Sequence, residues 1–299
     1  MRLYKKLAQG LADGIARAAM KISGQRIVIL HNHIFKNAGT TIDWALQRNF
    51  GDAFVDHRDD QLMRQGKSYL EYYLLDNKQI KALSSHHLSL PVPELVGVRM
   101  MIMMMFRHPI ERVTSVYKFE REQELLSTPG VIHAKKYALG EYIVWRMRPD
   151  VGPTIRNFHV RKTLPSNKLS QELITEQDMV AAKQFVKSIE LLGLVERFDE
   201  SMVLFEDNLK TIFPSIDLSY VAQNVGQEAS EEKGARLERL KTEIGNEIFE
   251  LLLNNNLQDL QLLAFVEEAF ESRISKVKDF AGKLANFRAR CAAKSEAIL

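Results

Sequence analysis

The chain of 299 residues is poor in cysteine, in net charge and in apolar sequence at its start. Its one cysteine, Cys291, excludes an internal disulfide and a cysteine-cluster metal site, which suits a reducing compartment. A net charge of +3 gives nucleic-acid binding no support. Residues 1–25 lack the continuous apolar core of a signal peptide or a membrane span. We therefore expect no transmembrane segment, and an amphipathic helix at this end.

The stretch 26–41 predicts a strand, a loop and a helix in that order. Ile27–Leu30 is an apolar, mostly β-branched run, as in strands that are buried on both faces. Apolar residues recur at helical spacing from Ile42 onward. In this order the loop amides and the positive end of the helix dipole converge on one point, where Lys36 adds an ammonium group. The loop therefore predicts a site for a phosphate or a sulfate.

Two other interpretations of this loop compete with that one. A Walker-type nucleotide loop has its lysine after the last glycine, whereas Lys36 precedes Gly39, so an ordinary ATP or GTP site fits badly. A plain strand-to-helix turn with a chance lysine fits equally well when the loop is taken alone. The choice depends on a second element of the chain.

That second element lies within residues 96–119. Met100–Phe106 is uniformly apolar, too short to span a bilayer and long enough for a central strand, with its methionines as adaptable core filling. Pro109 suits the first turn of a following helix. Arg107 then stands at the carboxyl end of a strand, where open α/β sheets bind ligands. Ser115 follows it about two turns into the helix.

Together, IFKNAGTT and FRHPIERVTSVY resemble the two phosphate-binding signatures of sulfotransferases that use 3′-phosphoadenosine 5′-phosphosulfate (PAPS). They are most similar to the carbohydrate branch of sulfotransferase family 2, which includes the heparan sulfate 2-O-sulfotransferases. Residues 157–161 and 191–205 resemble two later segments of that family, N-x-Q-x-R and G-L-T-E-R-F-D-E-S-L, and residues 256–270 match its last helix in part. Phe35 and Ala38 depart from the family, which has proline and commonly glycine at these places.

The resemblance implies a role for each matching residue. Lys36 would neutralise charge at the sulfuryl group during catalysis, and Arg107 with Ser115 would hold the 3′-phosphate of the donor. Asn157 and Arg161 would bind the acceptor. PAPS is then the cofactor, 3′,5′-adenosine bisphosphate is the product, and no metal takes part. The residues implied to cradle the 5′-phosphosulfate are Lys36, Asn37, Ala38, Gly39, Thr40 and Thr41.

Two adjacent histidines, His86 and His87, are candidates for the catalytic base. An imidazole with a near-neutral pKa suits removal of a proton from a sugar hydroxyl. Ser84–Leu90 predicts a short strand, in which neighbouring side chains point to opposite faces, so that only one ring faces a given cleft. The family has a G-H-x-x-F-like segment at this place, and its alignment favours His87 over His86. The alternative is one exposed and one hydrogen-bonded histidine without a catalytic part.

The resemblance implies a sulfotransferase that moves a sulfuryl group from PAPS to a hydroxyl of a carbohydrate or glycolipid acceptor, with an acidic acceptor among the alternatives. Animal members of the family are anchored in the Golgi by an N-terminal span, which residues 1–25 do not provide, so we expect a cytoplasmic and bacterial enzyme. A nucleotide-dependent kinase and a non-catalytic nucleotide- or sugar-binding protein with the same fold stay open as rivals. The acceptor and the oligomeric state are left open.

We expect a P-loop-like α/β fold in three parts. An amphipathic helix covers residues 1–25, and a PAPS-binding domain with a central, mainly parallel sheet flanked by helices covers residues 26–226. Helices over residues 227–299 pack on the same domain. Within them, an apolar stripe over residues 274–287 with basic flanks predicts a helix that packs on the domain, on a partner or on an anionic surface.

Local patterns predict further details. Tyr69–Leu83 predicts a helix, and residues 120–140 predict a helix end followed by a mobile loop. Leu191–Val195 predicts a short buried strand, and Thr175–Asp178 a capped helix start. Glu196–Arg197 predicts a structural ion pair between neighbours.

Overall fold

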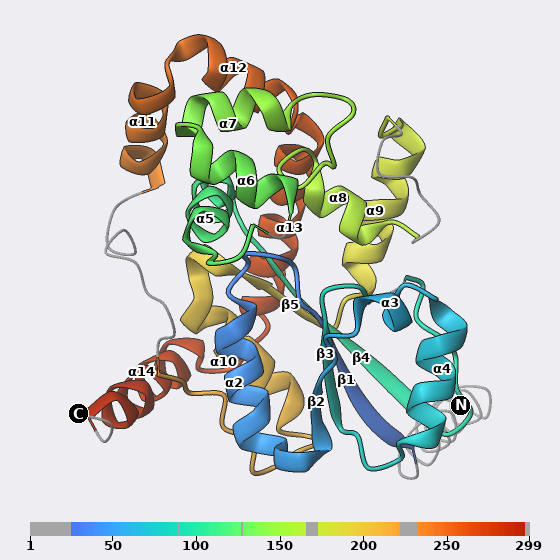
Figure 1. Cartoon of the computed structure of the whole chain (residues 1–299). Coiled ribbons are helices and arrows are strands. Elements are labelled where there is room, and N and C mark those ends of the chain that lie inside the picture. The colour runs from blue at the N-terminus through green and yellow to red at the C-terminus, as the bar shows by residue number, and fades with distance from the viewer. Residues whose placement is uncertain (1–24, 89, 127, 166–172, 222–232, 297–299) are drawn as a thin grey trace, which may run out of the picture.

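The computed structural model describes residues 25–88, 90–126, 128–165, 173–221 and 233–296. Five parallel strands form one sheet in the order β2-β3-β1-β4-β5, with helices on both faces (Figure 1). The predicted α/β fold with a parallel sheet is confirmed. The helix predicted at the amino terminus falls on residues outside this description. The strands are β1 (Arg26–Asn32), β2 (Phe54–Asp56), β3 (Ala82–Ser85), β4 (Val98–Phe106) and β5 (Leu191–Leu194).

Strand β1 lies at the centre of the sheet, between β3 and β4. Ile29 pairs with Ala82 of β3 on one side and with Met101 of β4 on the other. Val28–Leu30 are fully buried, as expected of a strand that is covered on both faces. From β1 the chain builds β2 and β3 on one side and then crosses to β4 on the other. The carboxyl ends of β1 and β4 therefore form a topological switch point, where α/β sheets bind ligands.

The first helices surround this point. Helices α5 to α8 gather beyond the carboxyl ends of the strands, whereas α2 and α4 lie beside the sheet (Figure 1). Helix α2 follows β1 directly, and α5 follows β4, so each begins at the switch point. The bounds are α2 (Gly39–Phe50), α3 (Asp60–Met63), α4 (Lys67–Asp76), α5 (Pro109–Glu122), α6 (Pro129–Lys136), α7 (Leu139–Arg146) and α8 (Phe158–Thr163), with a 3-10 turn η1 (Gly51–Ala53) after α2.

The helix predicted over Tyr69–Leu83 is too long, because α4 ends at Asp76 and the chain then enters β3. The guanidinium group of Arg26 donates hydrogen bonds to carbonyl oxygens at the end of α4 and in the segment that leads to β3. These carbonyls are therefore engaged outside the hydrogen bonds of a longer helix. The strand is correspondingly earlier than predicted, so that the two adjacent histidines follow it in a turn. The carbonyls bound by Arg26 belong to Leu74, Asn77 and Ile80.

The prediction of an uninterrupted loop up to Gly140 is also wrong. Helix α6 forms there because Thr128 accepts a hydrogen bond from the N–H of Val131 at 3.3 Å and Pro129 occupies the first helical position. The loop that does occur between α5 and α6 is short. Leu125 and Leu126 are exposed on it.

The remaining helices follow the sequence patterns more closely. Strand β5 is confirmed, and so is the cap of α9, where Thr175 and Asp178 bond reciprocally. The predicted pair between Glu196 and Arg197 is wrong, because Arg197 pairs with Glu200 and Glu271 while Glu196 accepts the N–H of His108 at 2.8 Å. The bounds are α9 (Glu176–Ser188), η2 (Val195–Arg197), α10 (Phe198–Leu209), α11 (Lys233–Ile244), α12 (Asn246–Asn254), α13 (Leu257–Ile274) and α14 (Phe280–Glu296).

The methionine-rich strand β4 is core, as predicted. Met103 and Met105 pack in the layer that holds α2, α10 and α14, whereas Met104 packs in the layer that holds α8, α9 and α13. This alternation is the period of a strand that is buried on both faces. The flexible thioether side chains fill both layers and leave the carboxyl end of β4 fixed between them.

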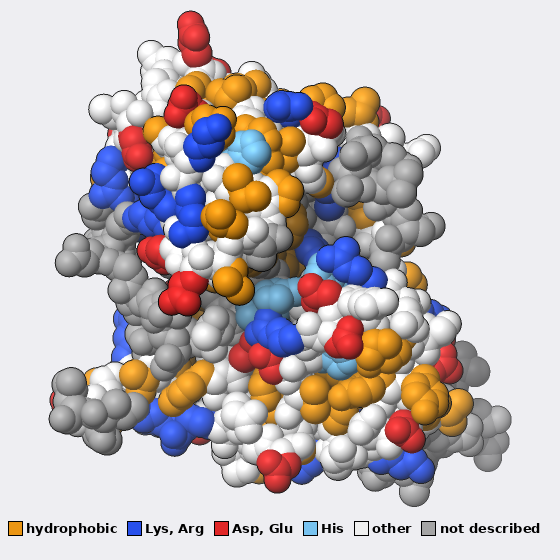
Figure 2. Space-filling model, viewed as in Figure 1, with side chains coloured by type: hydrophobic (Ala, Val, Ile, Leu, Met, Phe, Trp, Pro, Cys, Tyr) orange, Lys and Arg blue, Asp and Glu red, His pale blue; other side chains and the backbone are white. Residues whose placement is uncertain are grey.

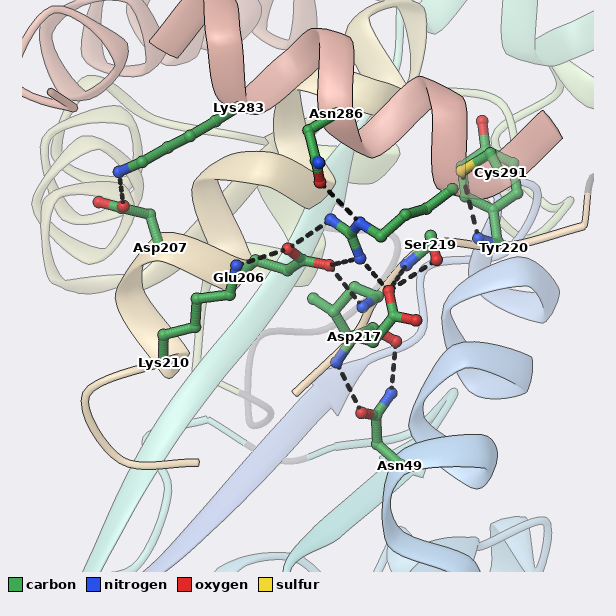
Figure 3. A network of polar contacts seen from close by, with 12 residues as sticks. Asn49, Glu206, Asp207, Lys210, Asp217, Ser219, Tyr220, Lys283, Asn286 and Cys291 are labelled. Carbon is green, nitrogen blue, oxygen red and sulfur yellow. Dashed lines mark hydrogen bonds and ion pairs between the residues drawn. The ribbon is translucent and has the colours of Figure 1, made fainter. Parts of the chain in front are cut away.

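The apolar stripe over residues 274–287 belongs to two helices, since α13 ends at Ile274 and α14 begins at Phe280. Phe287 of α14 is fully buried against the layer of α2 and α10. The polar contacts around it join α14 to Glu206 of α10 and to Asp217 (Figure 3). No helix among the described residues combines the length and the apolarity that a membrane crossing needs.

Candidate functional site

The loop between β1 and α2 has the backbone of an anion-binding loop. Lys36 (φ 63°) and Ala38 (φ 60°) both adopt the left-handed conformation, which non-glycine residues rarely do and which recurs at functional loops. Gly39 opens α2, and the amides of a first helical turn have no partner within the helix. Alternation of right- and left-handed residues turns backbone N–H groups toward one point. A loop with this backbone can offer N–H groups to an anion.

Two arginines of the second motif donate hydrogen bonds to backbone carbonyls of this loop. Arg107 donates from Nη1 to the carbonyl of Lys36 at 3.0 Å, and Arg112 donates from Nη1 to the carbonyl of Phe35 at 3.2 Å. Arg112 is fully buried, and burial lowers its pKa to about 10. These bonds fix carbonyl oxygens of the loop on this side. The second motif contains both arginines, but the sequence analysis assigned a role only to Arg107.

The ammonium group of Lys36 lies above the ring of Phe119, 4.7 Å from its centroid. The side chain is half-buried. Burial, and then the positive charge of Arg107, lower the pKa of Lys36 below its usual value. Two cations therefore stand close together at the switch point, and an anion bound there would relieve their repulsion.

Asn37 supports the loop from inside. Its N–H donates to the carbonyl of Ile34 at 3.1 Å, and its side-chain Nδ2 donates to the carbonyl of Met105 and to Nε2 of His159. His159 in turn is held at Nδ1 by Asp259, at 3.2 Å. Asn37 is buried and engaged with protein at these atoms, which differs from the phosphate contact that we expected of it.

The other residues of the two motifs lie around the loop. Thr40 is exposed and Thr41 is buried in the first turn of α2. Ser115 is half-buried on α5, past the carboxyl end of β4 where Arg107 lies. Arg107 thus contacts the loop directly through the carbonyl of Lys36, and Ser115 lies on α5, which begins shortly after Arg107.

Asn157 precedes the short helix α8 and Arg161 lies in it, and Asn157 is engaged with α13. Its Oδ1 accepts the N–H of Asp259 at 3.0 Å and its Nδ2 donates to Gln258 at 2.6 Å. Asn256 returns the contact by accepting the N–H of Asn157 at 3.0 Å. This reciprocal clamp explains why Asn157 holds a left-handed conformation (φ 44°). It makes Asn157 a structural residue in this arrangement, while Arg161 lies half-buried one turn further on.

The two candidate bases differ in their surroundings. Nδ1 of His86 lies 2.7 Å from the carbonyl of His33, and a carbonyl only accepts, so Nδ1 carries the hydrogen and Nε2 keeps its lone pair. The ring lies beside those of His33 and Phe35, at the loop. His87 instead has its Nε2 between Asp60 Oδ2 and Arg64 Nη2, at 3.0 and 3.1 Å.

Lysine and arginine side chains set the charge around both histidines. Burial first, and then nearby positive groups, lower the pKa of each ring to about 4. Lys162 of α8 donates to the carbonyl of His86 at 2.7 Å, and burial lowers the pKa of this lysine to about 8. Pale-blue histidine side chains gather at a hollow in the middle of the face seen in Figure 2, next to lysine or arginine and acidic side chains.

A cluster at the end of β1 was not foreseen from the sequence. Asp43 of α2 accepts from Nδ1 of His31 at 2.8 Å and from Nδ1 of His33 at 2.9 Å, and Arg58 Nη2 lies 3.1 Å from the same carboxylate. The three residues His31, His33 and Asp43 are the one group among the described residues with spacing that would suit a metal ion. The alternation of two histidines along a strand was the available signal, since it places both rings on one face.

Glycine at position 39 is required by this cluster. A Cβ atom there would lie 2.1 Å from Cδ2 and from Nε2 of the His33 ring, so no side chain fits. The ring of His33 therefore lies directly against the start of α2. The anion-binding loop and the histidine cluster form one packed unit.

Comparison with known proteins shows which family the chain is similar to. A family model described as "Sulfotransferase family" matches residues 20–266, most of the chain. An uncharacterized protein of Archaeoglobus fulgidus is 29% identical over 255 residues, which cover 82% of this chain and 98% of that protein. That relative is archaeal, so the bacterial origin that we expected stays a prediction.

Proposed function

This chain belongs to the sulfotransferase family, and from that premise we propose that it transfers a sulfuryl group from PAPS to a hydroxyl of a carbohydrate-like acceptor. The observation that carries the proposal is the pair of motifs at the switch point, where Arg107 binds the loop of Lys36 across the ends of β4 and β1. PAPS carries phosphate groups at the 3′ and the 5′ position of its ribose, and it therefore suits two anion sites that lie side by side.

The donor would be held by groups that are already oriented. The amides of Ala38 to Thr41 at the start of α2 and the hydroxyls of the two threonines would bind the 5′-phosphosulfate. Arg107 and Ser115 would bind the 3′-phosphate, and the fixed fork of a guanidinium group suits that task. Asn37 would contribute by holding the loop, through the contacts with Met105 and His159 described above.

Transfer would proceed in line, by analogy with phosphoryl transfer. The acceptor oxygen bonds to sulfur while the bond from sulfur to the bridging phosphate oxygen breaks, and 3′,5′-adenosine bisphosphate leaves. Lys36 would neutralise the charge that develops on the bridging and sulfuryl oxygens. This scheme draws its positive charge from Lys36, Arg107 and the start of α2, and it uses no metal.

We propose His86 as the base, ahead of His87, which the family alignment had favoured. The lone pair of His86 is at Nε2, because Nδ1–H is donated to His33, and the ring lies beside the loop. The Nε2 atom of His87 is already engaged by Asp60 and Arg64. The hydroxyl proton would move to Nε2 of His86 as the acceptor oxygen bonds to sulfur.

The acceptor is proposed from the chemistry of the surrounding groups. Lys162 of α8 and Arg64 place positive charge beside the histidines, which suits a carbohydrate or glycolipid that carries acidic groups. The absence of an internal disulfide is consistent with a cytoplasmic enzyme.

Calorimetry of nucleotide binding tests this function. We expect 3′,5′-adenosine bisphosphate to bind without Mg²⁺ and at least tenfold more tightly than 5′-AMP or ATP, because only it fills both anion sites. Arg107→Ala should remove most of that preference, since it deletes the ligand of the 3′-phosphate. Arg48→Ala, at the far end of α2 and exposed, is the matched control and should bind as the wild type does. Equal or tighter binding of ATP would favour a kinase and contradict the proposal.

A further inference from the structure

The carboxylate of Asp43 joins the unforeseen cluster to the proposed base. It is buried, and it receives the Nδ1 atoms of His31 and His33 and the guanidinium group of Arg58. Burial alone would raise the pKa of Asp43, but the two imidazoles, through charge and hydrogen bonds, outweigh it and hold that pKa far below its usual value. An ionised carboxylate only accepts hydrogen bonds, so both histidines donate to it from Nδ1.

A metal ion is the competing interpretation of this cluster, and Arg58 argues against it. The guanidinium Nη2 atom lies 3.1 Å from Asp43 Oδ2 and 3.5 Å from His33 Nδ1, so a positive charge already stands beside the carboxylate. Both Nδ1 atoms also carry hydrogens that they donate, whereas a metal ligand must offer a lone pair. The cation of this cluster is therefore the arginine.

The contacts continue from Asp43 to His86. The ring of His33 is fixed on one side by Asp43 and on the other by Gly39, which leaves no space for a Cβ atom. The backbone of His33 is thereby fixed as well, and its carbonyl accepts Nδ1–H of His86 at 2.7 Å. From α8, Lys162 donates to the carbonyl of His86.

Resting on the proposed function, we propose that Asp43 and His33 are positioning residues for the base, and that they keep Nε2 of His86 aimed as the proton acceptor. When Nε2 takes the hydroxyl proton, His86 becomes an imidazolium ion whose Nδ1–H stays on the carbonyl of His33. The cations near it are then Arg58 after β2 and Lys162 on α8, and Asp43 on α2 is paired with Arg58 and bonded to His33. Asp43 is the negative one, so it offsets the repulsion from the two cations.

Histidine tautomers test this proposal in the full-length protein, without knowledge of the acceptor. Nitrogen-15 spectra of labelled histidine, with 3′,5′-adenosine bisphosphate present, should show hydrogen on Nδ1 of His31, His33 and His86, with His33 and His86 neutral. In Asp43→Asn, the amide can accept from only one of His31 and His33, so the other should change tautomer. Arg58→Gln should keep the tautomers and raise the pKa of His86, because it removes a cation.

The same variants are then compared in turnover. Hydrolysis of PAPS, in which water takes the sulfuryl group and 3′,5′-adenosine bisphosphate leaves, should fall roughly ten- to a hundredfold in kcat for Asp43→Asn, with KM for PAPS unchanged within about twofold. Asp52→Asn, an exposed change on the turn after α2, is the matched control and should keep kcat. If Asp43→Asn does not fold, the pKa of His86 in Arg58→Gln decides instead.

Three results would overturn the inference: wild-type His86 with its hydrogen on Nε2, an unchanged kcat in Asp43→Asn, or an unchanged His86 pKa in Arg58→Gln. Stoichiometric Zn²⁺ binding that disappears in Asp43→Asn would replace it with a metal site. Failure of the proposed function looks different, since wild-type protein would then not prefer 3′,5′-adenosine bisphosphate over ATP. The tautomers could still be measured in that case.

Discussion

Lys36 combines three features that rarely occur in one residue. Its backbone is left-handed, its carbonyl is bound by Arg107 and its ammonium group lies over Phe119. The contact with the face of the Phe119 ring holds the ammonium group of Lys36 beside the loop. A lysine held in this way is suited to stabilise charge that appears only during transfer, because little reorganisation is needed at that moment.

Lys36→Met tests this role at the residue scale. Methionine keeps the apolar length of the side chain over Phe119 but lacks the charge, so we expect the protein to fold and kcat to fall by roughly two to three orders of magnitude. Release of 3′,5′-adenosine bisphosphate from PAPS measures the rate. Lys78→Met, an exposed change after α4, is the control. Turnover above about a tenth of the wild-type rate in Lys36→Met would remove Lys36 from the catalytic set.

Single residues were predictable from the sequence where their role depends on neighbours in the chain. Lys36 and Gly39 stand in one loop, and Arg107 ends a strong apolar strand, so local order was enough to single them out. Asp43 pairs with His33 only because α2 folds back beside β1, and a helical aspartate gives no sign of such a partner. Arg112 stands in the second motif, but its contact with the carbonyl of Phe35 could not be predicted from the chain order.

At the scale of elements, the loop after β1 is fixed from three sides. Arg107 and Arg112 bind its carbonyls from α5 and the end of β4, the His159–Asp259 pair reaches Asn37 from α8 and α13, and His33 presses on Gly39. Left-handed backbone at two non-glycine residues costs free energy, and these contacts offset that cost. The loop is thus held in a binding conformation before any ligand arrives, which lowers the entropic cost of binding.

Gly39→Ala tests the packing of the loop against the cluster. The added methyl group would meet the His33 ring at 2.1 Å, so either the ring or the start of α2 must move. We expect a loss of unfolding free energy of about 1–3 kcal/mol and weaker binding of 3′,5′-adenosine bisphosphate. Urea denaturation and calorimetry measure the two effects.

Gly152→Ala is the matched control for that change, because no atom lies within 4 Å of a Cβ added there. We expect it to leave nucleotide affinity unchanged. Equal stability and equal affinity in the two variants would show that His33 can move freely, and the packed unit of loop and cluster would not exist.

Elements were predictable where a pattern was long, and less so where a tertiary contact ended it. The strands β1, β4 and β5 and the cap of α9 follow from apolar runs and side-chain spacing. Helix α4 ended early because Arg26, far away in sequence, binds the carbonyls beyond it. The turn that carries His86 and His87 was therefore placed within a strand, and the argument from opposite faces did not apply.

At the scale of the whole molecule, the strand order brings the site together. Because β1 is central, the loop after it meets groups from β3 on one side and from β4 on the other. His86 follows β3 and Arg107 follows β4, so the proposed base and the proposed phosphate-binding arginine reach one loop from opposite sides. The amino-acid pattern predicted a parallel sheet but not this order, which decides which residues meet.

The C-terminal helix α14 stabilises the molecule away from the site. Its charges pair with Glu206, Asp207 and Asp217 (Figure 3). Glu206, Asp207 and their partners on α14 line a hollow of about 210 Å³. Asn49 of α2 bonds to the backbone N–H of Asp217 at 2.9 Å, so α14 is linked to the helix that begins at the anion site. Side-chain pairs of this kind suit a structural role better than a ligand site.

Buried histidines make the whole molecule sensitive to mild acid. Burial lowers the pKa values of His33, His86 and His87 below that of an unfolded histidine, which is about 6.5. Below that pH the unfolded chain binds protons that the folded chain does not, so stability falls as pH drops from about 6.5 toward about 4. Asp217, whose pKa burial would raise but whose bonds with Lys294 and Ser219 lower to about 2, loses its contribution only from about pH 4 downward.

Unfolding by urea at pH 7.5, 6, 5 and 4 distinguishes the contribution of the buried histidines from that of Asp217. We expect wild-type unfolding free energy to decrease through this range, and His86→Asn to reduce the decrease by roughly 1 kcal/mol, a figure discounted for the solvent exposure of the ring. Asp217→Asn should lower stability equally at every pH from 7.5 to 5, because that carboxylate is ionised throughout in both states. A wild-type curve that stays flat down to pH 5 would mean that the histidines titrate as they do in the unfolded chain. The cluster around Asp43 would then be open to water, and His86 would lack the desolvated setting in which its orientation matters.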